Sequence, residues 1–86
     1  MPWVYILRCA DGSLYVGQTD ELQARLVKHN DGSASAFTAE RRPVDLVYSE
    51  IPDRISALGR ERQLKRWTRA KKEALIAGDL AKLKWL

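Results

Sequence analysis

The stretch WVYILRCADGSLYVGQ, residues 3–18, decides the fold. Its two ends, WVYILRC (3–9) and LYVGQ (14–18), are rich in β-branched and aromatic residues and predict two strands. The Asp-Gly pair between them is a strong hairpin signal. A two-residue turn would send Tyr5 and Tyr15 to opposite faces, whereas a three-residue loop or a bulge would bring them to one face. The sequence leaves both registers open.

The next stretch predicts a helix and then a loop. Asp20 is expected to cap the helix, with Gln23 completing an approximate capping box. The helix should end near Asn30, where the run Asn-Asp-Gly-Ser stops it. Residues 31–43 are mostly small and polar, so we expect a long loop, which in so small a chain is either mobile or functional.

A third strand and further helices complete the order of elements. VDLVYSE (44–50) alternates apolar and polar residues and predicts a strand. A helix follows over about 54–68; Thr68 is expected to cap another that ends near Gly78, and Asp79 could cap a last short one. We therefore expect a small α+β domain of order β-β-α-β-α-α with antiparallel pairing at its start.

Length and composition bound the class of protein. Eighty-six residues make one small domain, expected to span residues 1–86. No apolar run is long enough to span a membrane, and the N-terminus lacks the pattern of a signal peptide. The single cysteine cannot form an internal disulfide, which suits a reducing cytoplasm. One Cys and one His also exclude a Cys/His zinc site.

The charge is distributed unevenly along the chain. Residues 54–86 hold ten Lys and Arg against three acidic residues, a net +7, whereas residues 1–53 have a net charge of −3. A basic helical half beside a slightly acidic half indicates a surface for polyanions, nucleic acid first. A solvated basic helix is the alternative.

One carboxylate lies on an apolar helix face in the stretch RISALGRERQLKRWT (54–68). The apolar residues that recur there at helical spacing are Ala57, Leu58, Leu64 and Trp67. Glu61 falls among them, and a half-buried carboxylate is costly unless it is paired or binds a metal. Two interpretations stay open: an ion pair with a neighbouring Arg, or a metal ligand in a phosphate-binding cleft.

Five residues together suit metal-assisted hydrolysis of a phosphodiester: Tyr5, Tyr15, Arg25, His29 and Glu61. Arg25 and His29 are four apart on the first helix and share a face. Arg25 could bind a phosphate, and His29 could transfer a proton. A lone Glu suits one Mg²⁺ that keeps most of its waters. For Arg25 or His29 alone, a surface role is the alternative.

These motifs resemble a known family. WVYIL followed by LYVGQT looks like the paired signature of the GIY-YIG nuclease domain. The similarity extends over residues 3–77 through RL-x-x-HN-x-G, RRPV-x-LVYSE and RERQLKRWTRAKKEALI, which resemble small single-domain bacterial members. The family positions match Tyr5, Tyr15-Val16-Gly17, Arg25, His29 and Glu61.

The resemblance implies a three-stranded antiparallel sheet flanked by helices, and it implies roles for the site. Tyr5 would be general base or proton relay, and Tyr15 would position water or phosphate. Arg25 would stabilise the phosphate and His29 would be a proton-transfer partner. Glu61 would be the sole protein ligand of one Mg²⁺ or Mn²⁺, which favours the metal interpretation of this carboxylate.

The sequence departs from the family pattern at three places. The first motif reads Trp3-Val4-Tyr5, without the family's Gly and Ile. Gln18 stands where DNA-repair relatives often carry Lys, and a late Asn of some members has no equivalent. These changes bear on catalytic strength and substrate choice rather than on the fold.

We expect a metal-dependent endonuclease that cuts DNA in preference to RNA and selects structure rather than base sequence, as a monomer or weak homodimer. The residues expected to contact nucleic acid are Gly17, Gln18, Arg41, Arg42, Lys65, Arg66 and Arg69. A non-catalytic nucleic-acid-binding module is the alternative. A protein–protein adaptor using Trp67 and Trp85 is a third hypothesis, and it requires an apolar exposed patch.

Overall fold

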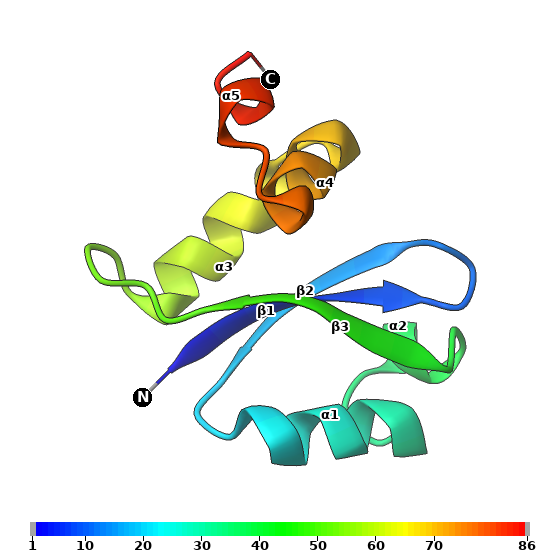
Figure 1. Ribbon diagram of the computed structural model, residues 1–86. Coiled ribbons are helices and arrows are strands. Elements are labelled where there is room, and N and C mark those ends of the chain that lie inside the picture. Colours follow the sequence, from blue (N-terminus) through cyan, green and yellow to red (C-terminus); the bar gives the residue numbers. More distant parts are fainter. Residues whose placement is uncertain (1, 86) are drawn as a thin grey trace.

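The sheet has the expected three antiparallel strands. The computed structural model describes residues 2–85. Its strands are β1 (Trp3–Cys9), β2 (Leu14–Thr19) and β3 (Val44–Glu50), and their order in the sheet is β2-β1-β3. The edge strands are therefore β2 and β3, and β1 is the central strand (Figure 1).

The β1–β2 hairpin has a three-residue loop. Leu7 pairs with Tyr15, and the amide of Gly12 donates to the carbonyl of Cys9 over 2.9 Å. Gly12 has φ 86°, a left-handed conformation that glycine adopts at little cost and that this loop type requires. This register puts Tyr5 and Tyr15 on one face, so the three-residue alternative is right.

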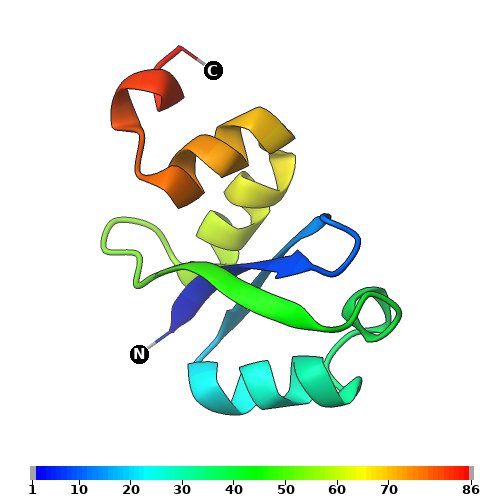
Figure 2. The ribbon, with the colours of Figure 1, turned by 45° about the vertical axis from the view of Figure 1, so that its right-hand side comes forward.

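Helices cover both faces of the sheet. On one side lie α1 (Leu22–Asp31) and α2 (Ala36–Ala39), and on the other lie α3 (Ala57–Arg66), α4 (Arg69–Ala77) and α5 (Leu80–Leu83). The turned view in Figure 2 shows the same separation. The expected order is confirmed, including the last short helix α5, and the structure adds the four-residue helix α2. None of the helices in the described part is long and apolar enough to cross a membrane.

Alternate side chains of β1 point to opposite faces of the sheet and contribute to two hydrophobic cores. The core under α3 and α4 is formed by Val4, Ile6, Val16, Ala57, Leu64 and Leu75. The core over α1 is formed by Tyr5, Leu7, Cys9 and Val44, with Tyr15, Leu22 and Leu26 packed against it. Because Tyr5 belongs to this second core and Tyr15 packs against it, the two tyrosines proposed to take part in chemistry both face α1.

The predicted caps hold for the C-terminal helices and fail for α1. The side chains of Thr68 and Asp79 accept hydrogen bonds from the first turns of α4 and α5, as expected. The prediction that Asp20 caps α1 is wrong, because the N-cap is Glu21, which makes no side-chain cap bond. The hydroxyl of Thr19 accepts the amide of Glu21 over 3.1 Å instead, so a local turn precedes the helix.

The stretch 31–43 is not one long loop. It contains α2, in which the amide of Ala39 donates to the carbonyl of Ser35 over 2.9 Å. The hydroxyl of Thr38 also donates to this carbonyl over 3.3 Å. Small polar residues give little helical signal, and what holds this turn is the burial of Thr38 against α1.

Candidate active site

A chain of hydrogen bonds runs from β1 through α1 to α2. The phenol oxygen of Tyr5 lies 2.8 Å from Nε2 of His29, and Nδ1 of His29 lies 2.9 Å from Oγ1 of Thr38. Because the Thr38 hydroxyl donates to the carbonyl of Ser35, it is free to accept from His29 Nδ1–H. Nε2 is then the acceptor for the Tyr5 hydroxyl, so the chain sets the imidazole tautomer.

The surroundings fix the protonation of both groups. Burial, together with Tyr15 and the negative charge of Glu61, raises the pKa of Tyr5 to about 12 despite the opposing charge of Arg25. Burial and the charge of Arg25 lower the pKa of His29. At neutral pH the phenol therefore keeps its proton and the imidazole is neutral, as the hydrogen-bond chain requires.

Tyr15 and Gly17 complete the wall around this chain. The Tyr15 ring meets the His29 ring edge-on, with centroids 5.2 Å apart. Gly17 pairs with Tyr5 across the hairpin, and a Cβ at position 17 would lie 2.5 Å from the Tyr5 phenol oxygen. Only glycine lets the phenol lie over β2, an edge strand of the sheet.

Arg25 stands beside the hydrogen-bonded chain. It is half-buried on α1, and its charge acts on the pKa of both Tyr5 and His29. It also lines an open hollow between the end of β2 and the start of α1, whose other lining residues are Pro2, Gln18, Thr19, Asp20, Glu21, Ala24 and Lys28. Gln18 and Arg25, both expected to contact substrate, thus share one hollow.

Glu61 lies on the buried face of α3. Ala57 and Leu64 are buried, and Glu61 is four residues after the first and three before the second. Its side chain is 15% exposed, and its ion-pair contact is with Lys65 at 3.5 Å rather than with an arginine. The prediction that Leu58 belongs to the apolar face is wrong: it is 45% exposed, because α3 turns the Ala57–Leu64 line inward.

Glu61 is less engaged than the other half-buried carboxylates. Glu50 accepts three hydrogen bonds from Arg60, and Glu73 accepts two from Arg8, at 2.7 and 2.9 Å. A carboxylate with one long contact to an amine can accept a hard cation that keeps most of its waters. Within residues 2–85 no cluster of three or more His, Cys, Asp and Glu side chains could hold a metal ion.

The five predicted residues are thus brought together to different degrees. Tyr5, Tyr15 and His29 are in direct contact. Arg25 on α1, and Glu61 on the helix that covers the opposite face, act on the Tyr5 pKa through their charges. The helix that carries Glu61, α3, packs against β2, the edge strand over which the Tyr5 phenol lies.

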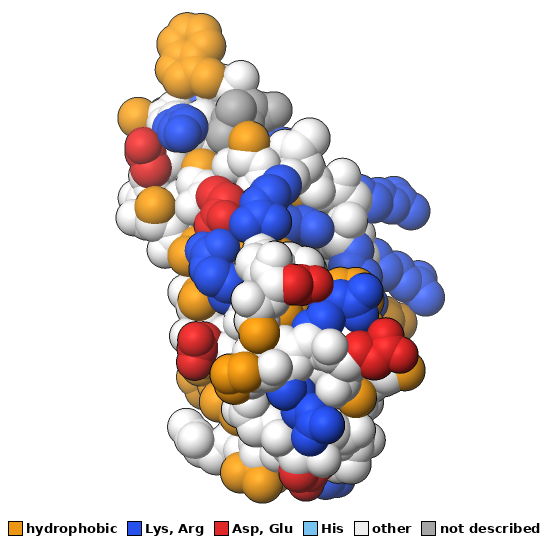
Figure 3. Space-filling view, turned by 90° about the vertical axis from the view of Figure 1, so that its right-hand side faces the viewer, with side chains coloured by type: hydrophobic (Ala, Val, Ile, Leu, Met, Phe, Trp, Pro, Cys, Tyr) orange, Lys and Arg blue, Asp and Glu red, His pale blue; other side chains and the backbone are white. Residues whose placement is uncertain are grey.

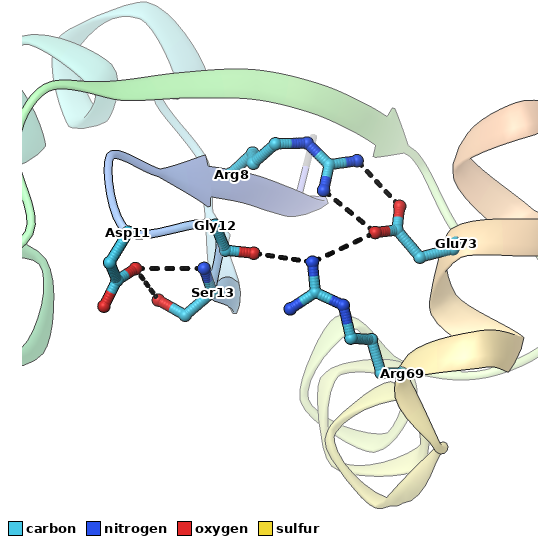
Figure 4. A network of polar contacts seen from close by, with 6 residues as sticks. All are labelled: Arg8, Asp11, Gly12, Ser13, Arg69 and Glu73. Atoms are coloured by element: carbon cyan, nitrogen blue, oxygen red, sulfur yellow. Dashed lines mark hydrogen bonds and ion pairs between the residues drawn. The ribbon is translucent and has the colours of Figure 1, made fainter.

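Of the residues expected to contact nucleic acid, Arg69 has a structural role in addition. One Nη of Arg69 donates to the carbonyl of Gly12 over 2.7 Å and lies 3.3 Å from Glu73, which also holds Arg8 (Figure 4). This network ties α4 to the hairpin loop. The Glu73 carboxylate is thereby committed to the fold.

Of the other basic residues expected to contact nucleic acid, some are exposed to solvent and some are hydrogen-bonded within the protein. Arg66 is exposed and Lys65 is half-exposed, and Figure 3 shows Lys and Arg side chains gathered over the α3–α4 half of one face. Arg42 donates to the carbonyl of Ala39 over 2.9 Å, and Arg41 is bound still more fully. The basic surface therefore lies mainly on α3 and α4.

Sequence reasoning missed Thr38, whereas its placement of Trp67 among the apolar residues of the helix is confirmed. Nothing in the local pattern marks Thr38, because its partner His29 lies nine residues earlier on another helix. Trp67 packs against the core, with the cations of Arg60 and Lys71 over its ring. It forms no apolar exposed patch, which weakens the adaptor hypothesis, although Trp85 is 90% exposed.

Comparison with known proteins gives a consistent result. The family model described as the GIY-YIG catalytic domain matches residues 1–74. A UPF0213 protein of Bacillus pumilus is 47% identical over 75 residues, which cover 86% of this chain and 76% of the relative. A UPF0213 protein of Staphylococcus aureus strain Mu3 is 49% identical, covering 86% and 92%. The solution NMR structure of the UPF0213 protein BH0048 from Bacillus halodurans superposes with a TM-score of 0.56 at 38% identity, covering 90% of this chain and 84% of that one.

Proposed function

The chain belongs to the family of the GIY-YIG catalytic domain, and on that premise we propose that it is a divalent-metal-dependent endonuclease that hydrolyses phosphodiester bonds in DNA. The observation that carries the proposal is the buried chain Tyr5–His29–Thr38 beside Arg25. Such a chain can move a proton without a strong free base. The protein acts as one domain, in the cytoplasm, as a monomer or weak homodimer.

The proton moves along the hydrogen bonds in two coupled transfers. The attacking water gives a proton to the Tyr5 oxygen while Tyr5 gives its own to Nε2 of His29. The water oxygen forms a bond to phosphorus, and the bond from phosphorus to the leaving oxygen breaks. The leaving oxygen takes a proton from solvent water, and the imidazolium of His29, whose Nδ1–H stays bound to Thr38, releases its extra proton back through the Tyr5 hydroxyl.

The negative charge that develops on the phosphate would be stabilised by Arg25 and by a metal ion held by Glu61. The Arg25 guanidinium stabilises the extra negative charge on the phosphate in the transition state. One Mg²⁺ or Mn²⁺ held by Glu61 would supply charge stabilisation at the scissile phosphate and the leaving oxygen. Lys65, 3.5 Å from this carboxylate, is displaced easily because it is half-exposed.

Substrate binding rests on the basic helices. Exposed Arg66 and the other cations of α3 and α4 contact phosphates without reading base sequence, so selectivity is for structure. Binding weakens steeply as salt rises. Tyr15 beside His29 positions the water or the phosphate.

One observation favours the alternative, a nucleic-acid-binding module without catalysis. Tyr5 is 1% exposed and His29 is fully buried, so water has little access to the phenol oxygen. A protein that binds through its surface alone needs no such access.

A cleavage assay separates the two. Labelled linear, single-stranded, flapped and branched DNA and RNA are incubated with Mg²⁺, with Mn²⁺ and with EDTA. Cutting that requires the ion and is strongest on a particular DNA structure supports the nuclease. Salt-sensitive binding to every substrate with no cutting under any of these conditions contradicts it and supports the binding module.

A further inference from the structure

Arg41 is held by internal partners. Its Nε donates to the Asp11 carboxylate over 3.1 Å, and its Nη1 donates to the carbonyl of Phe37 over 2.8 Å and lies 3.8 Å from Glu40. Two carboxylates thus offset its charge. Arg41 is therefore poorly suited to bind a phosphate, but these contacts fix the orientation of its guanidinium plane.

That plane lies against an aromatic ring. Cζ of Arg41 is 3.9 Å from the centroid of Phe37, and the two side chains remain 30% and 39% exposed. An exposed phenylalanine beside a weakly hydrated guanidinium face is a surface that water solvates poorly. It is also rigid, because α2 and the hairpin loop anchor it from two sides.

The surface is continuous with the proposed active site. The rings of Phe37 and Tyr15 are stacked, with centroids 6.0 Å apart and planes inclined by 25°. Tyr15 in turn contacts His29. A group resting on Phe37 and Arg41 would therefore lie next to the residues that act on the scissile phosphate.

We propose that the outer face of the Arg41 guanidinium, backed by the Phe37 ring, forms a stacking subsite for one unpaired nucleobase adjacent to the scissile phosphate. This rests on the proposed function and adds a substrate class: single strands and the unpaired ends or flaps of duplexes. Stacking on aromatic and guanidinium faces needs no base-specific hydrogen bond, so every base fits. In an intact duplex the bases are already stacked on each other and cannot reach the subsite.

The subsite and a phosphate clamp predict opposite results for Arg41→Lys. Lysine keeps the charge but has no plane. A stacking role requires Arg41→Lys to behave like Phe37→Leu, and it leaves the salt dependence of binding nearly unchanged because the charge is already offset by Asp11. A phosphate contact requires Arg41→Lys to bind like the wild type, with Arg41→Gln reducing the salt slope by about 0.7.

The test measures binding, so it does not depend on cleavage. Single-stranded DNA and RNA oligonucleotides carrying one 2-aminopurine are titrated onto the full chain with Glu61→Gln, which is expected to be inactive. We expect quenching of the 2-aminopurine fluorescence, its loss in Phe37→Leu and Arg41→Lys, and a roughly 5- to 20-fold weaker affinity for single strands. Duplex affinity should stay unchanged. Arg54→Lys is the matched control, because Arg54 is exposed in the bend before α3 and is not among the expected nucleic-acid contacts.

Two results would overturn the subsite: quenching that persists in Phe37→Leu, or Arg41→Lys that binds single strands as tightly as the unmutated protein does. The DNA and RNA arms show which strand supplies the base. If no substrate is cut by the wild type, the proposed function fails, while the quenching data still decide the subsite.

Discussion

The phenol oxygen of Tyr5 lies 2.8 Å from Nε2 of His29, and neither side chain is more than 1% exposed. In this hydrogen bond the phenol donates and Nε2 of His29 accepts, because Thr38 accepts from Nδ1–H, the other ring nitrogen. The arrangement links a strand residue to two helices. It is both a stabilising contact of the core and the proposed path of the proton.

Tyr5→Phe should lower the cleavage rate about 10²-fold or more, the typical worth of a positioned proton-transfer group. It should also cost about 1–3 kcal/mol of stability, because Nε2 of His29 is left without its donor. Tyr48→Phe is the matched control: burial raises the pKa of Tyr48 to about 12 as well, but its hydroxyl donates to Glu50 outside the site. Equal loss of activity in both variants would contradict the role of Tyr5.

His29 should titrate below its ordinary pKa of 6.5, because burial and then the charge of Arg25 disfavour the imidazolium. The unfolded chain then binds the proton more readily, so the free energy of unfolding should fall as the pH drops below about 6.5, until the folded pKa is reached. The single histidine gives one imidazole signal in an NMR titration. A pKa at or above 6.5 would refute this picture of the site.

Gly17→Ala should destabilise the protein by about 1–3 kcal/mol and impair cleavage, because the new Cβ would push the Tyr5 phenol away from His29. Gly59→Ala is a matched control in helix α3. Its Cβ would lie 3.0 Å from the exposed side chain of Ile55 and 3.2 Å from the Ser56 hydroxyl, contacts that small side-chain shifts relieve, and alanine is favoured over glycine in helices by about 0.5–1 kcal/mol. Urea unfolding of both variants checks the prediction, which fails if they shift stability equally.

Glu73→Gln should lower stability by about 1 kcal/mol at pH 7, an amount limited by the partial exposure of the pair. The hydrogen bonds from Arg8 hold the pKa of Glu73 below its ordinary 4.5. The carboxylate's contribution is therefore fully present above pH 4.5 and is lost as the pH falls through the folded pKa. Unfolding free energies at pH 7 and pH 3 should show the variant's deficit shrinking; a deficit independent of pH would contradict this.

The sequence was informative where a signal is local. The strands around Asp-Gly and the caps Thr68 and Asp79 depend on neighbouring residues, and all appear in the structure as predicted. The hairpin register could not be chosen, because an Asp-Gly pair fits a two-residue turn and, with Gly12 in the left-handed conformation, a three-residue loop. That choice decides whether Tyr5 and Tyr15 share a face.

The rest depends on partners that are distant in the chain. Arg41 looked like a free cation, but Asp11 holds it from thirty residues away. Thr38 looked like part of a loop, and only its contact with His29 reveals it as the end of the hydrogen-bond chain. Leu58 fits a helical pattern by its spacing, yet which line of α3 turns inward is set by packing against the sheet.

Glu61→Gln tests the central claim, metal-dependent phosphodiester hydrolysis, most directly. Its cleavage rate on the preferred DNA is compared with that of the wild type and of Glu40→Gln, a variant at a carboxylate that is 80% exposed. We predict a loss of about 10²-fold or more for Glu61→Gln, with DNA binding retained and Glu40→Gln unaffected. If Glu61→Gln cuts as fast as the wild type, this carboxylate holds no catalytic ion and the account is wrong.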